Sequence, residues 1–415
     1  MQFKTLALLA GLTGITPALA DNDPYLWLEG VDDEKALDWV RAENASSAER
    51  LKANPLFEEL YSEAKAVLNA SSRLPDVNQK GDWLYNFWRD ESNPRGVYRR
   101  ARFANFASDD PEWEVVIDID ALSNKENKQW VFKGMNCLPK HPQHCLVSLS
   151  PGGGDAVVSR EFNSLSKTFV KDGFFLPLAK GGASWIDADT LFVFTDFGEG
   201  SMTDSGYPRI VKRWKRGTPL ADAELVYEGD VKSVSASASR LRSAGGDIDL
   251  VRDGKTFWTS ERFQLLDGEL RHLEIPLSAT VNGAFQGRLI ISLKEDWKRD
   301  GKTYPQGAVL IADTSALKAG GKGAIEVLVK PDKATVVQSV STTDSTVLVT
   351  VLENVRGRIY RYNPGPEGRF VRTQIDFPDN RRTEETGNAC PQHQSKNDGN
   401  NDGKAIFIFH GNLLN

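Results

Sequence analysis

Residues 145–162, CLVSLSPGGGDAVVSREF, decide the fold class of this chain. Two runs rich in Val, Leu and Phe, at 146–149 and 156–162, flank a turn that begins Ser150-Pro151-Gly152. Short β-prone runs around Pro and Gly are typical of strands joined by a hairpin. The glycines at 152–154 are followed by Asp155 and lack the Lys-Ser/Thr of a phosphate-binding loop, so we interpret them as the turn.

The same alternation of β-prone runs and turn residues continues from about residue 77 to 377. The predicted strands are 82–89, 97–103, 113–118, 146–149, 156–162, 190–195, 210–214, 255–261, 288–293, 307–312, 347–351 and 358–362. About 300 residues of antiparallel strands exceed one ordinary sandwich. At four strands and roughly 40–50 residues per blade, they fit a β-propeller of six or seven blades.

The chain in front of the predicted propeller divides into two segments. Residues 1–20 resemble a secretory signal, with Lys4, an apolar run at 6–15 and the small-residue cleavage site Ala18-Leu19-Ala20. The run is too short to span a bilayer comfortably. We therefore expect cleavage after Ala20, export to the periplasm, and no membrane attachment of the mature chain.

Residues 21–76 form the predicted N-terminal helical segment. Asp32 or Asp33 can cap a first helix, and Asn54-Pro55 can begin a second one with proline at its first position. The second helix carries an apolar stripe at helical spacing: Phe57, Leu60, Tyr61, Ala64 and Leu68. A further apolar set lies before and in the first helix and needs a surface to cover it: Tyr25, Leu26, Trp27, Leu28 and Trp39.

The tail at 381–415 has a different composition and is predicted to be irregular and disordered. It lacks Trp and Tyr, and only 405–409 (AIFIF) could form a strand. Residues 398–403 repeat the first half of a calcium loop. The twelfth position is Phe409 where a bidentate Glu is required, so the sequence does not predict a calcium site.

Charge and cysteine content limit the function classes further. The chain of 415 residues has a net charge of −6 with acidic and basic residues interspersed, which does not predict nucleic-acid binding. Cys137 and Cys145 bracket a predicted hairpin loop and could form a disulfide in an oxidising compartment. The alternative is a zinc site with His141 and His144, although neighbouring residues 144 and 145 would point to opposite faces of a strand.

Several motifs in order resemble the prolyl oligopeptidase family of serine peptidases, in its N-terminal region and in the type exported by bacteria. The family-motif residues at the front are Tyr25, Trp27, Leu28, Glu29, Trp39 and Asn44. Further matching stretches are 145–150, 152–155, 160–162, 173–177, Trp185, Asp189, 195–197, 205–209, Lys212 and 214–220. The resemblance covers about residues 23 to 380.

The resemblance implies a seven-bladed propeller that caps an α/β-hydrolase domain and admits only short peptides to it. The hydrolase domain would supply a Ser-Asp-His triad, and the N-terminal helices would pack on it. This chain contains no Gly-X-Ser-X-Gly nucleophile turn; 182–185 (GASW) is the nearest look-alike, and Ile186 replaces the second glycine. We therefore expect no catalytic residues, cofactor or metal here, and an incomplete propeller of about six blades at 77–380.

Three functional hypotheses follow. In the first, the chain is the substrate-gating part of a serine-type endopeptidase, truncated before its hydrolase domain and inactive alone. In the second, it is a non-catalytic secreted propeller that binds a peptide or glycan. In the third, it is a truncated or frame-disrupted remnant that aggregates through unpaired strand edges. The first predicts that Trp27 and Trp39 are less buried than the propeller strands, because their docking surface is the absent hydrolase domain.

Overall fold

The computed structural model describes residues 23–30, 32–70, 72–73, 75–106 and 111–376. The chain forms two compact units, one up to Arg73 and one from Leu74 onward. The division falls three residues before the boundary expected at 76. The signal at 1–20, the tail at 381–415 with Cys390, and the calcium-like stretch lie outside the described residues.

The N-terminal unit consists of a 3-10 turn, η1 (Leu26–Glu29), and two helices, α1 (Glu34–Lys52) and α2 (Phe57–Asn69). Of the two cap candidates, Asp33 caps α1, because its Oδ1 accepts the N–H of Ala36 at 3.0 Å. The second helix begins two residues later than predicted. The side chain of Asn54 accepts the N–H of Leu56 at 3.0 Å, so it closes a turn around Pro55 before the helix starts.

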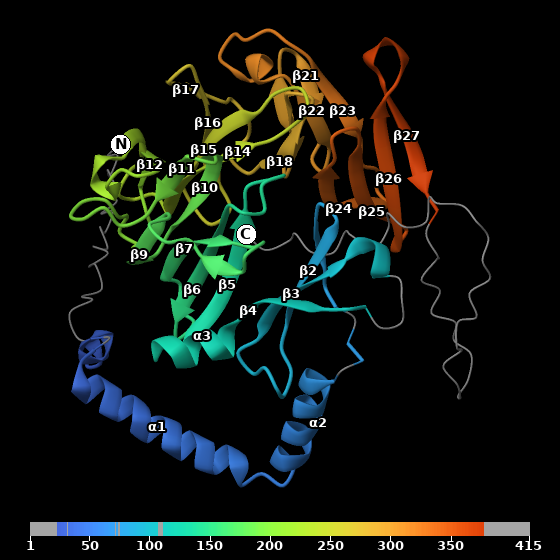
Figure 1. The fold of residues 1–415 in the computed structure, drawn as a ribbon. Helices are drawn as coiled ribbons and strands as arrows, with labels where there is room; N and C mark the ends of the chain where they lie inside the picture. Colours follow the sequence, from blue (N-terminus) through green and yellow to red (C-terminus); the bar gives the residue numbers. More distant parts are fainter. Residues whose placement is uncertain (1–22, 31, 71, 74, 107–110, 377–415) are drawn as a thin grey trace, which may run out of the picture. The chain divides into compact units, whose positions relative to one another are not determined.

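The second unit is a β-propeller with six blades among the described residues, each an antiparallel sheet (Figure 1). Blade 1 is β1 (Asn78–Lys80), β2 (Trp83–Trp88), β3 (Val97–Arg102) and β4 (Glu114–Asp118). Blade 2 is β5 (Trp130–Cys137), β6 (Cys145–Pro151), β7 (Val157–Asn163) and β8 (Thr168–Phe169), with β9 (Phe175–Ala179) also paired to β7. Blade 3 is β10 (Gly182–Asp187), β11 (Thr190–Phe194), β12 (Ile210–Lys215) and β13 (Glu224–Glu228).

The remaining blades repeat the pattern, with one insertion. Blade 4 is β14 (Ser235–Leu241), β15 (Ile248–Gly254), β16 (Ser260–Leu266) and β17 (Glu269–His272). Blade 5 is β18 (Thr280–Phe285), β19 (Arg288–Ser292), β22 (Val309–Ala312) and β23 (Ile325–Val329), with the hairpin β20 (Trp297–Arg299) and β21 (Lys302–Tyr304) inserted between β19 and β22. Blade 6 is β24 (Thr335–Thr342), β25 (Val347–Glu353), β26 (Arg356–Pro364) and β27 (Phe370–Ile375).

Hydrophobic packing joins each blade to the next one. Five buried clusters fill the interfaces between blades 1 and 2, 2 and 3, 3 and 4, 4 and 5, and 5 and 6. Successive side chains of a strand point to opposite faces of its sheet. A blade that lies between two neighbours therefore buries apolar residues on both faces. Among the described residues, no such cluster joins blade 6 back to blade 1.

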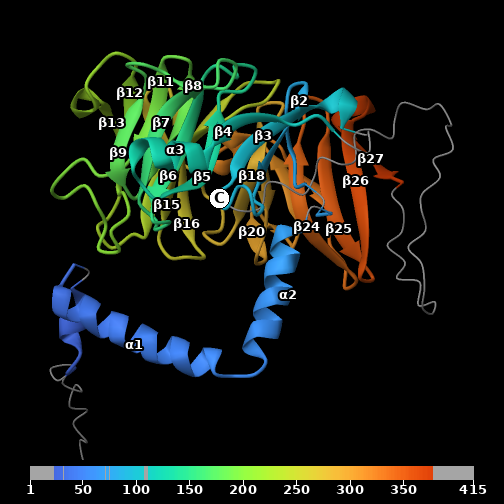
Figure 2. The same ribbon diagram turned by 60° about the horizontal axis from the view of Figure 1, so that its bottom comes forward.

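The structure corrects the sequence prediction in two places. Residues 255–261 were expected to be a strand, but Lys255 and Thr256 donate to the carbonyl of Thr259 and form a turn, and β16 begins at Ser260. The helix α3 (Ile119–Glu126) follows blade 1 and was not predicted. Figure 2 shows it beside the strands of blade 2. In the described part of the chain, no helix combines the length and the apolar character needed to cross a membrane.

Candidate functional site

The first strand of each blade lies toward the centre of the ring, and the last one toward the outside (Figure 1). These inner strands are rich in small residues: β10 reads GASWID, β14 reads SASASRL and β18 reads TVNGAF. An inner strand pairs on one side only, so backbone N–H and C=O groups on its other edge are available to a ligand. The centre of the propeller is thus a candidate passage for an extended peptide.

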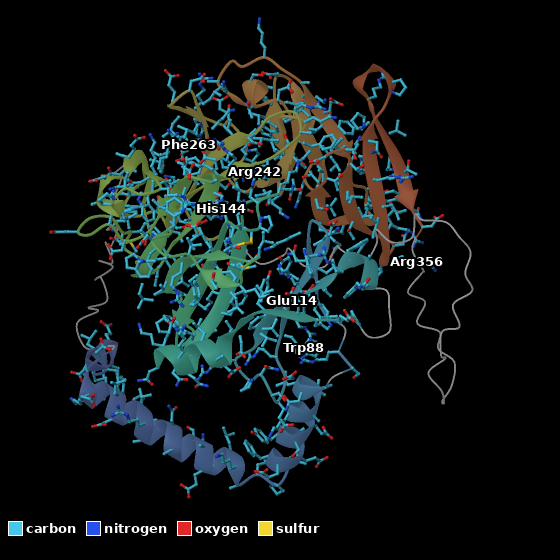
Figure 3. All side chains as sticks on the ribbon, viewed as in Figure 1. Trp88, Glu114, His144, Arg242, Phe263 and Arg356 are labelled. Atoms are coloured by element: carbon cyan, nitrogen blue, oxygen red, sulfur yellow. A yellow bond between two sulfur atoms is a disulfide. The ribbon has the colours of Figure 1, made fainter. Side chains whose placement is uncertain are left out.

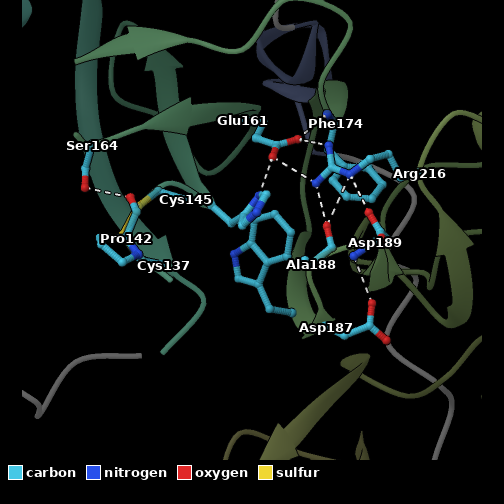
Figure 4. A network of polar contacts seen from close by, with 12 residues as sticks. Cys137, Pro142, Cys145, Glu161, Ser164, Phe174, Asp187, Ala188, Asp189 and Arg216 are labelled. Atoms are coloured by element: carbon cyan, nitrogen blue, oxygen red, sulfur yellow. Dashed lines mark hydrogen bonds and ion pairs between the residues drawn. A yellow bond between two sulfur atoms is a disulfide. The ribbon is translucent and has the colours of Figure 1, made fainter. Parts of the chain in front are cut away.

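A buried polar network joins the third strands of blades 2 and 3 (Figure 4). The carboxylate of Glu161 on β7, with a side chain 1% exposed, accepts two hydrogen bonds from Arg216, at 2.7 and 2.9 Å. The N–H of Phe174 donates to it at 2.9 Å. Arg216 follows β12 and also donates to the Ala188 carbonyl at 2.6 Å and to Asp189 at 3.1 Å.

The electrostatics of this network fix the charge of both main partners. Burial by itself would raise the pKa of Glu161, but the hydrogen bonds from Arg216 and Phe174 lower it by more, so its pKa lies below the usual value. The hydrogen bonds to Glu161 raise the pKa of Arg216 despite its burial. The pair therefore stays ionised at neutral pH and connects the two blades by charge.

The predicted hairpin at 137–145 lies against this network. Cys137 and Cys145 are opposite each other on β5 and β6 and are joined by a disulfide. The zinc alternative fails, because both thiols are used in this bond and Nδ1 of His144 lies 3.2 Å from Oε1 of Glu161. Over the described ranges, no group of three or more acidic, Cys or His side chains could hold a metal.

Contacts continue from this hairpin to blade 4, between His144 and Arg242, which are labelled in Figure 3. The ring of Trp185 lies 5.9 Å from that of His144, and its Nε1 donates to the Asn136 carbonyl at 3.1 Å. Arg242, just after β14, donates to the carbonyls of Trp185 and Ile186 at 3.0 Å. The inner strands of blades 2, 3 and 4 are therefore held in register by side-chain contacts to backbone carbonyls.

A hollow with a volume of about 370 Å³ lies between blades 1 and 2. It is lined by aromatic rings and two arginines: Phe87, Arg89, Pro94, Arg95, Trp130, Val131 and Phe132. The combination of ring faces and guanidinium groups suits a ligand with an apolar body and a polar end. Trp130 and Phe132 belong to β5, the inner strand of blade 2.

The family-motif residues all lie in the N-terminal unit. Tyr25 precedes η1, which contains Trp27, Leu28 and Glu29, while Trp39 and Asn44 are on α1. The rings of Trp27 and Trp39 meet edge to face at 6.2 Å. Even so, Trp39 is 41% exposed and Trp27 is only partly buried. The look-alike Ser184 lies within strand β10, where no nucleophile turn exists.

Comparison with known families decides what this propeller is. Residues 17–388 match the model of the prolyl oligopeptidase N-terminal β-propeller domain. The chain belongs to the prolyl oligopeptidase family. The resemblance inferred from the sequence motifs is therefore confirmed over almost the range expected.

Two curated relatives are peptidases by name. It is 33% identical over 369 residues to an uncharacterized peptidase of Sinorhizobium fredii, covering 86% of this chain and 51% of the relative. It is 28% identical to an uncharacterized peptidase of Rickettsia prowazekii, covering 83% of this chain and 51% of the relative. The chain spans about half the length of the curated relatives that it matches.

Solved structures of related peptidases have a similar fold. A post-proline cleaving enzyme from Rickettsia typhi superimposes with a TM-score of 0.78 at 26% identity, covering 85% of this chain and 53% of that one. Oligopeptidase B from Trypanosoma brucei has a TM-score of 0.62 at 17% identity, covering 90% and 51%, and so shares the fold.

The sequence did not predict the Glu161–Arg216 network or the inner-strand contacts of Arg242. Residues 160–162 and 214–220 were noted only as family motifs. Glu161 and Arg216 are 55 positions apart in the chain, and nothing in the local sequence around either residue indicates that they meet. A buried carboxylate in an alternating strand was the available signal, since such a group needs a cation or several donors.

Proposed function

We propose that this chain is the substrate-gating propeller of a prolyl oligopeptidase-like serine peptidase that hydrolyses short peptides. The observation that carries the proposal is the match to the prolyl oligopeptidase N-terminal β-propeller domain, together with relatives named as peptidases of which the chain covers about half. The centre of the propeller would act as the passage, admitting only a short or extended peptide. The propeller would thus exclude folded proteins by size.

The chain by itself is proposed to be inactive. Acyl transfer requires a nucleophile, a base and an oxyanion hole held together. The sequence has no Gly-X-Ser-X-Gly, and Ser184, the nearest candidate, lies in an inner strand. The catalytic groups would come from a hydrolase domain, as the family resemblance implies.

The N-terminal helices are proposed to dock on that hydrolase domain. The apolar stripe of α2 supports this, because Leu60, Tyr61 and Leu68 are all more than half exposed in the N-terminal unit. An exposed stripe of this kind marks an interaction surface. The exposed ring of Trp39 on α1 supports it as well.

A serine-reactive probe tests the enzymatic part of the proposal. The purified chain should not react with a fluorophosphonate and should not cleave a proline-containing chromogenic peptide. The Rickettsia typhi enzyme, tested in parallel, is the positive control. Labelling of this chain, together with inhibitor-sensitive cleavage, would overturn the proposal.

Export to the periplasm, with cleavage after Ala20, is also proposed. The disulfide between Cys137 and Cys145 supports an oxidising compartment. Amino-terminal sequencing of the protein from a periplasmic fraction should begin at Asp21. Recovery of the uncleaved chain from the cytoplasm would contradict the proposal.

A further inference from the structure

Two arginines lie directly opposite each other in blade 4. Arg252 on β15 pairs in register with Arg262 on β16, so their side chains leave the same face of the sheet. Leu250 shares this face and packs in the cluster between blades 4 and 5, so the two guanidinium groups are on the side of blade 5. Like charges placed opposite each other destabilise a sheet.

The nearby carboxylates form their ion pairs with other cations. Asp253 and Glu261 lie on the opposite face of the same strands, and both pair with Lys255, at 2.5 and 3.0 Å. Asp249 pairs with Arg240 at 2.7 Å. On β15 and β16, these carboxylates therefore lie on one face and the two arginines on the other.

The arginine pair also has few hydrogen bonds. Arg262 is 8% exposed and donates to the Ser260 carbonyl at 3.2 Å, and in the described part of the chain neither arginine has an ion pair. Gln264, two residues along the same face, has a buried Oε1 without a partner. Buried charges and amides are normally paired. This cluster thus holds two guanidinium groups without an ion pair in the described part of the chain and one acceptor without a hydrogen bond.

The pKa values of both arginines are consistent with this lack of ion-pair partners. Burial, together with the neighbouring charge of Arg252, lowers the pKa of Arg262 to about 10. Burial also lowers the pKa of Arg252. A bound anion would remove both effects, because it would neutralise the guanidinium groups where they lie.

The cluster sits near one end of the blade. The start of β14 pairs with the end of β15, so Arg252 lies two residues from the end at which blade 3 connects to blade 4. Because every blade repeats this order, the start of β1 lies at the same end of the ring. The cluster therefore lies toward the end of the ring at which β1 begins.

We propose that Arg252, Arg262 and Gln264 form a binding site for the C-terminal carboxylate of a short peptide. The guanidinium groups bind the carboxylate by charge-assisted hydrogen bonds. The free oxygen of Gln264 accepts the N–H that precedes a peptide's terminal carboxylate, which inorganic anions lack. The inference rests on the proposed function for the presence of peptides, and adds which group of the peptide is recognised.

Titration calorimetry with the whole mature chain tests the site. The probes are the tripeptide Gly-Pro-Ala with a free carboxylate and its C-terminal amide. The free acid should bind about tenfold or more tightly than the amide, since charge-assisted contacts distinguish them. Arg252→Met and Arg262→Met should each abolish this preference. Arg41→Gln on α1, which removes an exposed arginine paired with Glu34 and Asp38, should keep it.

The outcomes separate this site from the proposed function. Equal binding of acid and amide would overturn the carboxylate site and leave peptide binding intact. Binding of neither probe would overturn the carboxylate site and leave the gating function, which the serine-reactive probe tests separately. A preference that persists in both arginine variants would also overturn the site. Thermal unfolding checks that the variants fold; Arg262→Met should melt no lower than the parent, because it removes a buried unpaired charge.

Discussion

Replacing Arg216 by methionine isolates the contribution of the network between blades 2 and 3. The substitution keeps the length and apolar stem of the side chain and removes its charge. Glu161 then loses the two hydrogen bonds at 2.7 and 2.9 Å and retains the N–H of Phe174 and the ring of His144. A carboxylate that is 1% exposed would be left without its cation.

The magnitude follows from the geometry. Removing one partner of a buried ion pair costs about 3–5 kcal/mol. Because the side chain of Arg216 is 26% exposed, water can replace part of its hydrogen bonding to Glu161. We therefore expect a cost at the lower end of this range, about 3 kcal/mol. With an unfolding entropy of about 2.1 cal/mol/K per residue over roughly 300 residues, the melting temperature should fall by about 5 °C.

Differential scanning calorimetry measures this change, with two controls. Glu161→Gln/Arg216→Met removes both charges and should lose less than the sum of the single substitutions, because no uncompensated charge remains. Lys232→Met breaks an exposed pair with Asp204 and should leave the melting temperature unchanged. A fall of less than 1 °C in Arg216→Met would refute the reasoning that this pair holds blades 2 and 3 together.

The pH dependence gives an independent check. The pKa of Glu161 is lower in the folded chain than in the unfolded one. Its contribution is therefore complete above the unfolded pKa of about 4.5 and is lost as the pH falls through the lower, folded value. Between pH 6 and 3, the parent should lose more stability than Glu161→Gln. Parallel curves for the two proteins would contradict this.

Three further predictions concern the propeller. Cys137→Ser/Cys145→Ser should lower the free energy of unfolding, measured in urea, by about 2.5 kcal/mol, because the disulfide closes a loop with a sequence separation of 8. An unchanged free energy of unfolding would show that the bond is dispensable. Hydrogen bonds from Arg100 and Lys167 lower the pKa of Glu114 to about 2, so acid should destabilise the parent more than Glu114→Gln between pH 4.5 and 2. Burial lowers the pKa of Lys80 to about 8. Between pH 8 and 10.5 the folded chain has lost this proton while the unfolded chain retains it, so stability relative to Lys80→Met should rise with pH. A stability difference that does not change with pH would count against burial.

Local patterns predicted much of the fold. The hairpin at 145–162 and strands such as 190–195 follow from β-prone runs separated by turns, and β11 (Thr190–Phe194) confirms one of them closely. The prediction failed at 255–261, where Phe257 and Trp258 have high β propensity but are 84% and 86% exposed in a turn. Propensity describes how a residue fits a pleated, half-buried surface, and these two residues have no such surface.

The sequence by itself determined the architecture, because strand period and turn residues are local properties, and ordered motifs identified the family. Only the tertiary structure decided which charges meet. It brings Glu161 to Arg216 across two blades and places Arg252 opposite Arg262 without a carboxylate. The physical reason is that register and blade packing set these contacts. The partners are on different strands, and their spacing along the chain contains no information about the distance between them.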